Sequence, residues 1–334
     1  MRRLTVNPAS RINENHFHLQ RKGESRMSIK KGALAIAFVL IFAAACQRPA
    51  SLPQSPQRPR VIVTLFPLYD FARAVAGDHA EVKMLLSPGM EPHAYEPSPS
   101  DVAGIMAASL FVYTGAAMEP WAERILKSAP NPRRRVVDTS SGIHLMEGEG
   151  DDGHHHGHGG DPHIWLDFEN ARLMVNSIAE GFALMDLPNA QLYKDNASIY
   201  NKQLEELDAA YQKGLARCAT RELIHGGHYA FGYMARRYRL DYHAAYGFSP
   251  EAEPSPNTMM ALTKRVKASG ARGVFYEELV LPKTAQAIAG EAGVPLLQLN
   301  AAHNVTREQM VRGVTFIGLM RENLQNLRTG LACE

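Results

Sequence analysis

Short hydrophobic runs alternate along this chain with stretches of helical periodicity. The run 61–65 is apolar and β-branched, as in a buried strand, and the periodic stretch 69–75 stops at Gly77. Strands are then expected at 81–86 and 110–113, with a helix between them that begins at Ser100-Asp101 and runs towards Ala108. This order predicts a mostly parallel sheet covered by helices.

One long helix is expected in the middle of the chain, from Asn189 to about Leu215. Its apolar positions recur at helical intervals, at Leu192, Ile199, Leu204, Leu207 and Tyr211. Beyond it the strand and helix rhythm resumes, with strands at 222–224, 272–276 and 295–299 and helices through 233–235, 283–292 and 308–327. We therefore predict an α/β protein with two lobes, each a mostly parallel sheet flanked by helices, joined by one long rigid helix.

The N-terminal region predicts export. Residues 27–45 carry two lysines, an apolar run and small residues, which is the order of a secretory signal peptide, and the run is too short for a stable membrane anchor. Cys46 follows three alanines, which resembles the lipobox of bacterial lipoproteins, although the usual leucine is absent. The alternative is ordinary signal cleavage. Residues 1–26 lie upstream of a complete signal, so we interpret them as an extension from a start codon assigned too early.

The remaining chain divides by composition and pattern. Residues 46–60 are rich in Pro, Gln, Ser and Arg and are expected to be a lipid-anchored linker. The expected folded parts are an N-terminal lobe at 61–185, a linking helix at 186–216 and a C-terminal lobe at 217–334. A net charge of +2 shows no basic excess, so no nucleic-acid partner is expected. Cys218 and Cys333 either form a disulfide or never meet, and both alternatives stay open.

Three histidines stand in loops at the ends of predicted strands, where open α/β sheets place their ligands. They are His93 in Pro-His-Ala-Tyr-Glu-Pro, His163 in Asp-Pro-His-Ile-Trp-Leu-Asp and His228 in Gly-Gly-His-Tyr-Ala-Phe. A single histidine is more often a surface or hydrogen-bonded core residue, but three in equivalent loops favour a metal centre. Neutral imidazoles are good Zn²⁺ ligands, and Asp161, Asp167 and Glu91 could orient them.

A second histidine-rich feature lies in the loop 147–160. It contains two aspartates, several glycines and four histidines: His154, His155, His156 and His158. Imidazoles favour borderline divalent ions over Mg²⁺ or Ca²⁺, so we interpret this loop as an auxiliary collector or sensor of metal. A solvated polar loop without metal is the alternative.

The motifs together resemble one known family. The segments 92–101 and 161–167, Tyr193-x-x-Asn196-Ala197 and His228-x-Ala230-Phe231-Gly232-Tyr233 are similar to those of the ZnuA/TroA-like (cluster A-I) solute-binding lipoproteins of zinc and manganese ABC importers. The resemblance covers nearly all of 61–331. It implies a class III periplasmic-binding-protein-like fold and a metal held between two lobes by the three histidines. It also implies an ABC permease and its ATPase as partners.

The fourth ligand departs from the family pattern. Many members have an aspartate at the position of Asn300, and an amide is a weaker donor than a carboxylate. Glu277, Asn300 through its carbonyl oxygen or a water could complete the shell, with His303 ranked below them. Loss of an anionic ligand weakens Mn²⁺ more than Zn²⁺, which accepts three nitrogens and a water.

The expected function is therefore capture of Zn²⁺ outside the cytoplasm for an ABC importer. The protein would be a monomer without enzymatic activity, in the periplasm or on the cell surface, anchored through lipid at Cys46. Three alternatives stay open: a Mn²⁺ or Fe²⁺ homologue, a metal-binding adhesin or buffer lipoprotein, and a zinc hydrolase with Glu277 or Glu278 as general base. No His-Glu-x-x-His motif supports the hydrolase.

Overall fold

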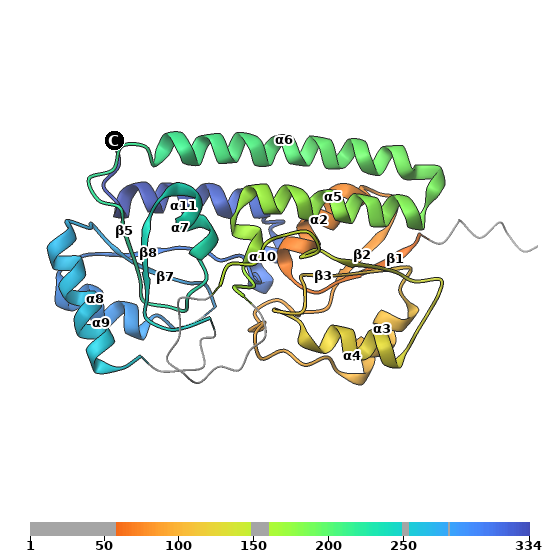
Figure 1. Cartoon of the computed structure of the whole chain (residues 1–334), viewed down its shortest axis with the longest axis horizontal. Helices are drawn as coiled ribbons and strands as arrows, with labels where there is room; N and C mark the ends of the chain where they lie inside the picture. Colours follow the sequence, from red (N-terminus) through yellow and green to blue (C-terminus); the bar gives the residue numbers. More distant parts are fainter. Residues whose placement is uncertain (1–57, 148–159, 249–253, 280) are drawn as a thin grey trace, which may run out of the picture. The chain divides into compact units, whose positions relative to one another are not determined.

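The computed structural model describes residues 58–147, 160–248, 254–279 and 281–334 (Figure 1). The expected N-terminal extension, signal peptide and Cys46 lie outside the described residues, as do His154, His155, His156 and His158 of the auxiliary loop. These remain predictions, together with the exact lobe boundaries.

The first lobe contains a sheet of four parallel strands in the order β2-β1-β3-β4. Their bounds are β1 Arg60–Val63, β2 Glu81–Met84, β3 Leu110–Tyr113 and β4 Arg135–Asp138. The central strands β1 and β3 are almost continuously apolar, as expected where helices cover both faces of a parallel sheet. The pattern did not predict β4, because this edge strand is short and its first two residues are exposed.

The helices of this lobe are α2 Phe66–Ala76, α3 Pro99–Ala107, α4 Pro120–Ser128 and α5 Phe168–Met185. The N-terminus of α3 differs from the expected one. Ser98 is the cap: its hydroxyl accepts from the amide of Asp101, and the Asp101 carboxylate accepts from the amide of Ser98. This reciprocal capping box satisfies two free amides and starts the helix at Pro99 rather than at Ser100-Asp101.

The long helix α6 spans Ala190–Gly214 and packs on α5 and α2 of the first lobe and on α11 of the second (Figure 1). Its buried residues are three or four positions apart: Tyr193, Ala197, Tyr200, Leu204, Leu207 and Tyr211. The sequence predicted Ile199 among the apolar positions of this helix, and this was wrong, because Ile199 is 61% exposed. Tyr200 takes the buried position instead, because its ring packs on Phe71 and its hydroxyl donates to Asp70.

The second lobe repeats the architecture, with four parallel strands in the order β6-β5-β7-β8. The strands are β5 Glu222–His225, β6 Asp241–Ala244, β7 Val274–Tyr276 and β8 Leu296–Gln298; the helices are α7 Gly232–Tyr238, α8 Pro256–Ser269, α9 Lys283–Ala292, α10 Arg307–Val311 and α11 Phe316–Gly330. Two α/β lobes with parallel sheets, joined by a long helix, confirm the predicted fold class.

The closing helix expected at 308–327 is two helices, so this prediction was wrong. Gly313, between α10 and α11, has a φ of 69°, a left-handed conformation that glycine adopts without a steric cost. Thr315 then caps α11 by accepting from the amide of Gly318. Hydrophobic periodicity does not register such a break, because apolar residues continue on both sides of it.

A disulfide joins Cys218, just after α6, to Cys333 at the end of the chain. The two residues also form a short antiparallel bridge, and the amide of Ala219 donates to the carbonyl of Ala332. The end of the second lobe is thus fastened to the end of α6. In the part of the chain that the structure describes, no helix is both long enough and apolar enough to cross a membrane.

The largest hydrophobic cluster includes residues of both lobes and of α6. Phe71 of α2 contacts Phe316 of α11 edge to face, with ring centres 5.2 Å apart, and Phe168 of α5 contacts Tyr211 of α6 at 5.0 Å. Smaller clusters lie on the other face of each sheet. The helices α2, α5, α6 and α11 therefore share one core that joins the two lobes.

Candidate metal centre

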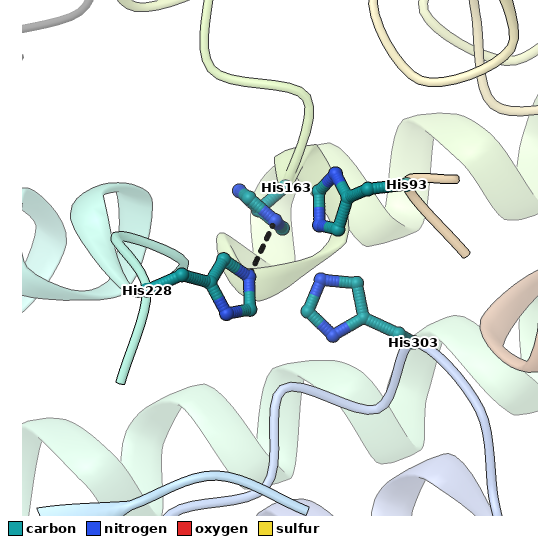
Figure 2. A group of neighbouring side chains, drawn as sticks. All are labelled: His93, His163, His228 and His303. Carbon is teal, nitrogen blue, oxygen red and sulfur yellow. Dashed lines mark hydrogen bonds between the residues drawn. The ribbon is translucent and has the colours of Figure 1, made fainter. Parts of the chain in front are cut away.

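Four histidines from four separate loops come together (Figure 2). His93 lies between β2 and α3, and His163 immediately precedes the 3-10 helix η1, Ile164–Leu166. His228 lies between β5 and α7, and His303 between β8 and α10. One ring nitrogen of each lies within 4.8 Å of those of the other three. His163, His228 and His303 are buried and His93 is half-buried.

The four rings are nearly equidistant from one another. The six distances between ring centres lie between 4.9 and 5.4 Å. Four points with equal pairwise separations are the corners of a regular tetrahedron. Tetrahedral coordination by nitrogen and sulfur is the geometry that Zn²⁺ adopts in proteins.

A carboxylate lies behind each of the three buried rings. Asp161 Oδ1 is 2.6 Å from Nδ1 of His163, the Glu277 carboxylate contacts Nδ1 of His228, and Glu278 Oε1 is 3.4 Å from Nδ1 of His303. With Nδ1 engaged in this way, Nε2 is left to face the centre. A carboxylate that accepts the outer ring proton fixes the tautomer and the ring orientation of a metal-binding imidazole.

Among the described residues, the Nε2 atoms of the four histidines have no hydrogen-bond partner outside the group. Nε2 of His163 and Nε2 of His228 lie 3.3 Å apart across the centre, as the dashed line in Figure 2 shows. Nε2 of His93 and Nε2 of His303 are buried and have no hydrogen-bond partner in the described part of the chain. Buried polar atoms without partners are rare, so these two nitrogens, beside two more that face each other, fit a cation.

The protein environment keeps three of these rings neutral, those of His93, His163 and His303. Burial lowers the pKa of His93 to about 3, and burial also holds the pKa of His163 and of His303 well below the ordinary value. Burial raises the pKa of Asp161 to about 7. Burial, and then the neighbouring Glu277 charge, raise the pKa of Glu278 to about 7. A metal ion binds the neutral imidazole, so such a site is ready for it.

Glu277 behaves differently from the other two carboxylates. Burial acts to raise its pKa, but the hydrogen bonds and charge of His228 and the charge of His225 together outweigh burial, so the pKa of Glu277 is lowered overall. Its Oε1 also accepts from the amide of His228, at 3.3 Å. Glu277 therefore supports His228 from behind and is not among the grouped atoms that could hold the ion.

Asn300, the other protein candidate for the fourth donor, is used within its own loop. Its Oδ1 accepts from the amide of Ala302 at 2.7 Å, and its backbone is bonded at both ends to the side chain of Asn323. The geometry therefore groups His303 with His93, His163 and His228, and includes neither Glu277 nor Asn300. His303 supplies the fourth converging nitrogen.

The loop that carries His303 is fastened to the first lobe. Nδ2 of Asn304 donates to the carbonyls of Ser87 and Met90, and the indole nitrogen of Trp165 donates to the carbonyl of Ala301. Ala302 has a φ of 59°, which is strained for a residue with a side chain. Strained backbone of this kind persists where its surroundings impose it, often at functional sites.

Two other carboxylates named from the sequence have different partners. Glu91 accepts from the amide of Ala94, and Asp167 pairs with Arg237. The sequence carries a signal for Glu278 and His303, because both residues follow strands of the second lobe, as the loop of His228 does. The rule that placed the first three histidines applied equally to them.

This chain is similar to known proteins in sequence and in fold. A family model for "Zinc-uptake complex component A periplasmic" matches residues 61–330. The high-affinity zinc uptake system protein ZnuA of Bacillus subtilis is 32% identical over 310 residues, covering 90% of this chain and 97% of that protein. The zinc-binding protein AdcA of Streptococcus pyogenes is 31% identical over 315 residues, covering 90% of this chain. This chain spans 61% of the length of AdcA.

Solved structures are also similar to this chain in fold. The Zn(II)-bound ZnuA-like domain of Streptococcus pneumoniae AdcA superposes with a TM-score of 0.71 at 31% identity, covering 82% of this chain and 99% of that domain. The metal-dependent lipoprotein YcdH of Bacillus subtilis gives a TM-score of 0.72 at 31% identity, with the same coverage. The resemblance inferred from the motifs is thereby confirmed. This chain belongs to the family of periplasmic component A proteins of zinc-uptake complexes.

Proposed function

We propose that this protein captures Zn²⁺ outside the cytoplasm and delivers it to the permease and ATPase of an ABC importer. The four histidines His93, His163, His228 and His303 hold the ion as cargo. The mature chain is a monomer anchored to the membrane by lipid at Cys46. The names of its relatives support this role, since the Bacillus subtilis protein is a zinc uptake protein and a Streptococcus pneumoniae relative is a zinc-binding lipoprotein.

The spacing of the four rings is the observation that carries the proposal. In a tetrahedral site, a bond of about 2.0–2.1 Å between zinc and nitrogen, extended by a ring radius of about 1.2 Å, places the ring centres about 5.2–5.4 Å apart. The observed separations are 4.9–5.4 Å. The rings therefore surround a space that fits one zinc ion bound through nitrogen.

The donor set favours zinc over its closest rivals. Four neutral imidazoles suit Zn²⁺, whereas Mn²⁺ favours oxygen ligands and octahedral geometry. The same donor set argues against a zinc hydrolase, because a catalytic zinc site keeps one position open for water. Glu277 and Glu278, the candidate bases, face the outer nitrogens of two rings instead of an open position.

Metal titration tests the assignment. We expect one tight Zn²⁺ per chain, with much weaker Mn²⁺ binding, and weaker zinc binding when His93, His163, His228 or His303 is replaced by Ala. The matched control is His79→Ala, because His79 is exposed and lies outside the cluster. Wild-type zinc binding in all four cluster variants would refute the proposal. A variant lacking 151–158 should keep the tight site, since we assign that segment only an auxiliary role.

A further inference from the structure

The short helix α7 follows the His228 loop directly and presents two side chains to the segment that carries His163. Tyr233 and Arg237 are four residues apart, so they lie on the same face of the helix. Phe231 precedes the helix, and the amide of Ala235 donates to its carbonyl. Any shift of this helix is therefore transmitted to the loop of His228.

This face of α7 contacts the His163 segment on both sides of the histidine. The hydroxyl of Tyr233 donates to the carbonyl of Asp161 at 2.9 Å, and Nη1 of Arg237 donates to Oδ1 of Asp167 at 2.9 Å. Asp161 lies two residues before His163 and Asp167 four residues after it. The buried 3-10 helix η1 connects His163 to Asp167, so the segment between the two contacts is short and packed.

Arg237 is itself held by α6. Its Nε and Nη2 donate to the two carboxylate oxygens of Asp208, both at 2.7 Å, and the hydroxyl of Tyr238 donates to Asp208 at 2.6 Å. A guanidinium bonded in this bidentate way has a defined orientation, which the single ammonium group of a lysine does not reproduce. One arginine thus joins α6, α7 and the start of α5.

We infer that Tyr233 and Arg237 are positioning residues for the metal centre, which set the spacing between His163 of the first lobe and His228 of the second. This inference rests on the proposed function. A fixed spacing suits a small tetrahedral ion and penalises an ion that needs more ligands at longer range. The two residues therefore contribute to the preference for zinc without touching it.

The test measures Zn²⁺ affinity by chelator competition, and the visible absorption of bound Co²⁺, in the full chain. Arg237→Met and Tyr233→Phe should each weaken zinc binding about 10–100-fold, as loss of an orienting partner does. Each should also alter the Co²⁺ spectrum, which reports ligand geometry. Arg237→Lys should recover little of the zinc affinity. Arg172→Met is the matched control, because Arg172 also bridges two carboxylates, Glu169 and Glu205, away from the centre.

A folded Arg237→Met chain with wild-type zinc affinity and an unchanged Co²⁺ spectrum would overturn the inference. If Arg237→Met does not fold, Tyr233→Phe decides by the same two readouts, since it removes only a hydroxyl. A loss of thermal stability without change in zinc affinity or spectrum would show a purely structural role and also overturn it. If the wild type and Arg172→Met both fail to bind zinc, the proposed function itself is wrong, and this inference falls with it.

Discussion

A buried carboxylate that is not part of the histidine cluster gives the most quantitative prediction. Glu119 is 3% exposed and accepts from the hydroxyl of Thr64 at 2.5 Å and from the amides of Thr114 and Gly115, each at 3.1 Å. Burial raises the pKa of Glu119 to about 7, and these hydrogen bonds only partly offset it. Between pH 4.5 and 7 the folded state therefore keeps a proton that the unfolded state has lost.

The sign of the effect follows from this difference. The stabilisation from protonated Glu119 is fully present below pH 4.5 and is lost as the pH rises to about 7. Since each pKa unit corresponds to about 1.4 kcal/mol, the loss amounts to about 3 kcal/mol. Glu119→Gln cannot ionise and should escape this loss.

Urea unfolding of metal-free wild type and Glu119→Gln, followed by circular dichroism from pH 4.5 to 8, measures the effect. Subtracting the unfolding free energy of the variant from that of the wild type at each pH removes the contributions of the other titrating groups. Relative to the variant, the wild type should lose about 3 kcal/mol of unfolding free energy across this range. A difference independent of pH would show that the hydrogen bonds balance burial, and one that increasingly favours the wild type as the pH rises would show that they outweigh it.

Three further predictions concern stability and metal binding. Replacing Cys218 and Cys333 by Ser should lower the free energy of unfolding by about 2–5 kcal/mol in urea titrations, because the disulfide closes a long loop; equal stabilities would contradict this. Tyr200→Phe leaves buried Asp70 without its 2.7 Å hydroxyl donor and should cost about 1–3 kcal/mol, measured by thermal unfolding; an unchanged midpoint would refute it. Glu278→Gln should weaken zinc binding about 10–100-fold in chelator competition by releasing the fourth imidazole, and unaltered affinity would exclude that role.

Much of the fold was predictable because its signals are local. The apolar run of β3 and the bounds of α9 were predicted to the residue, since each depends on neighbouring side chains and on nearby turn residues. The strands β4 and β6 were missed, because short edge strands are partly exposed and lack a continuous apolar run. The break before α11 was missed because it depends on the conformation of one glycine.

The sequence by itself determined the two-lobe α/β class, the family and the three loops that carry His93, His163 and His228. Only the tertiary structure brought His303 into the group and assigned a carboxylate to each buried ring. The physical reason is separation along the chain: His163 and His303 are 4.9 Å apart between ring centres although many elements lie between them. Local patterns report which side chains are available, whereas the shared core decides which of them meet.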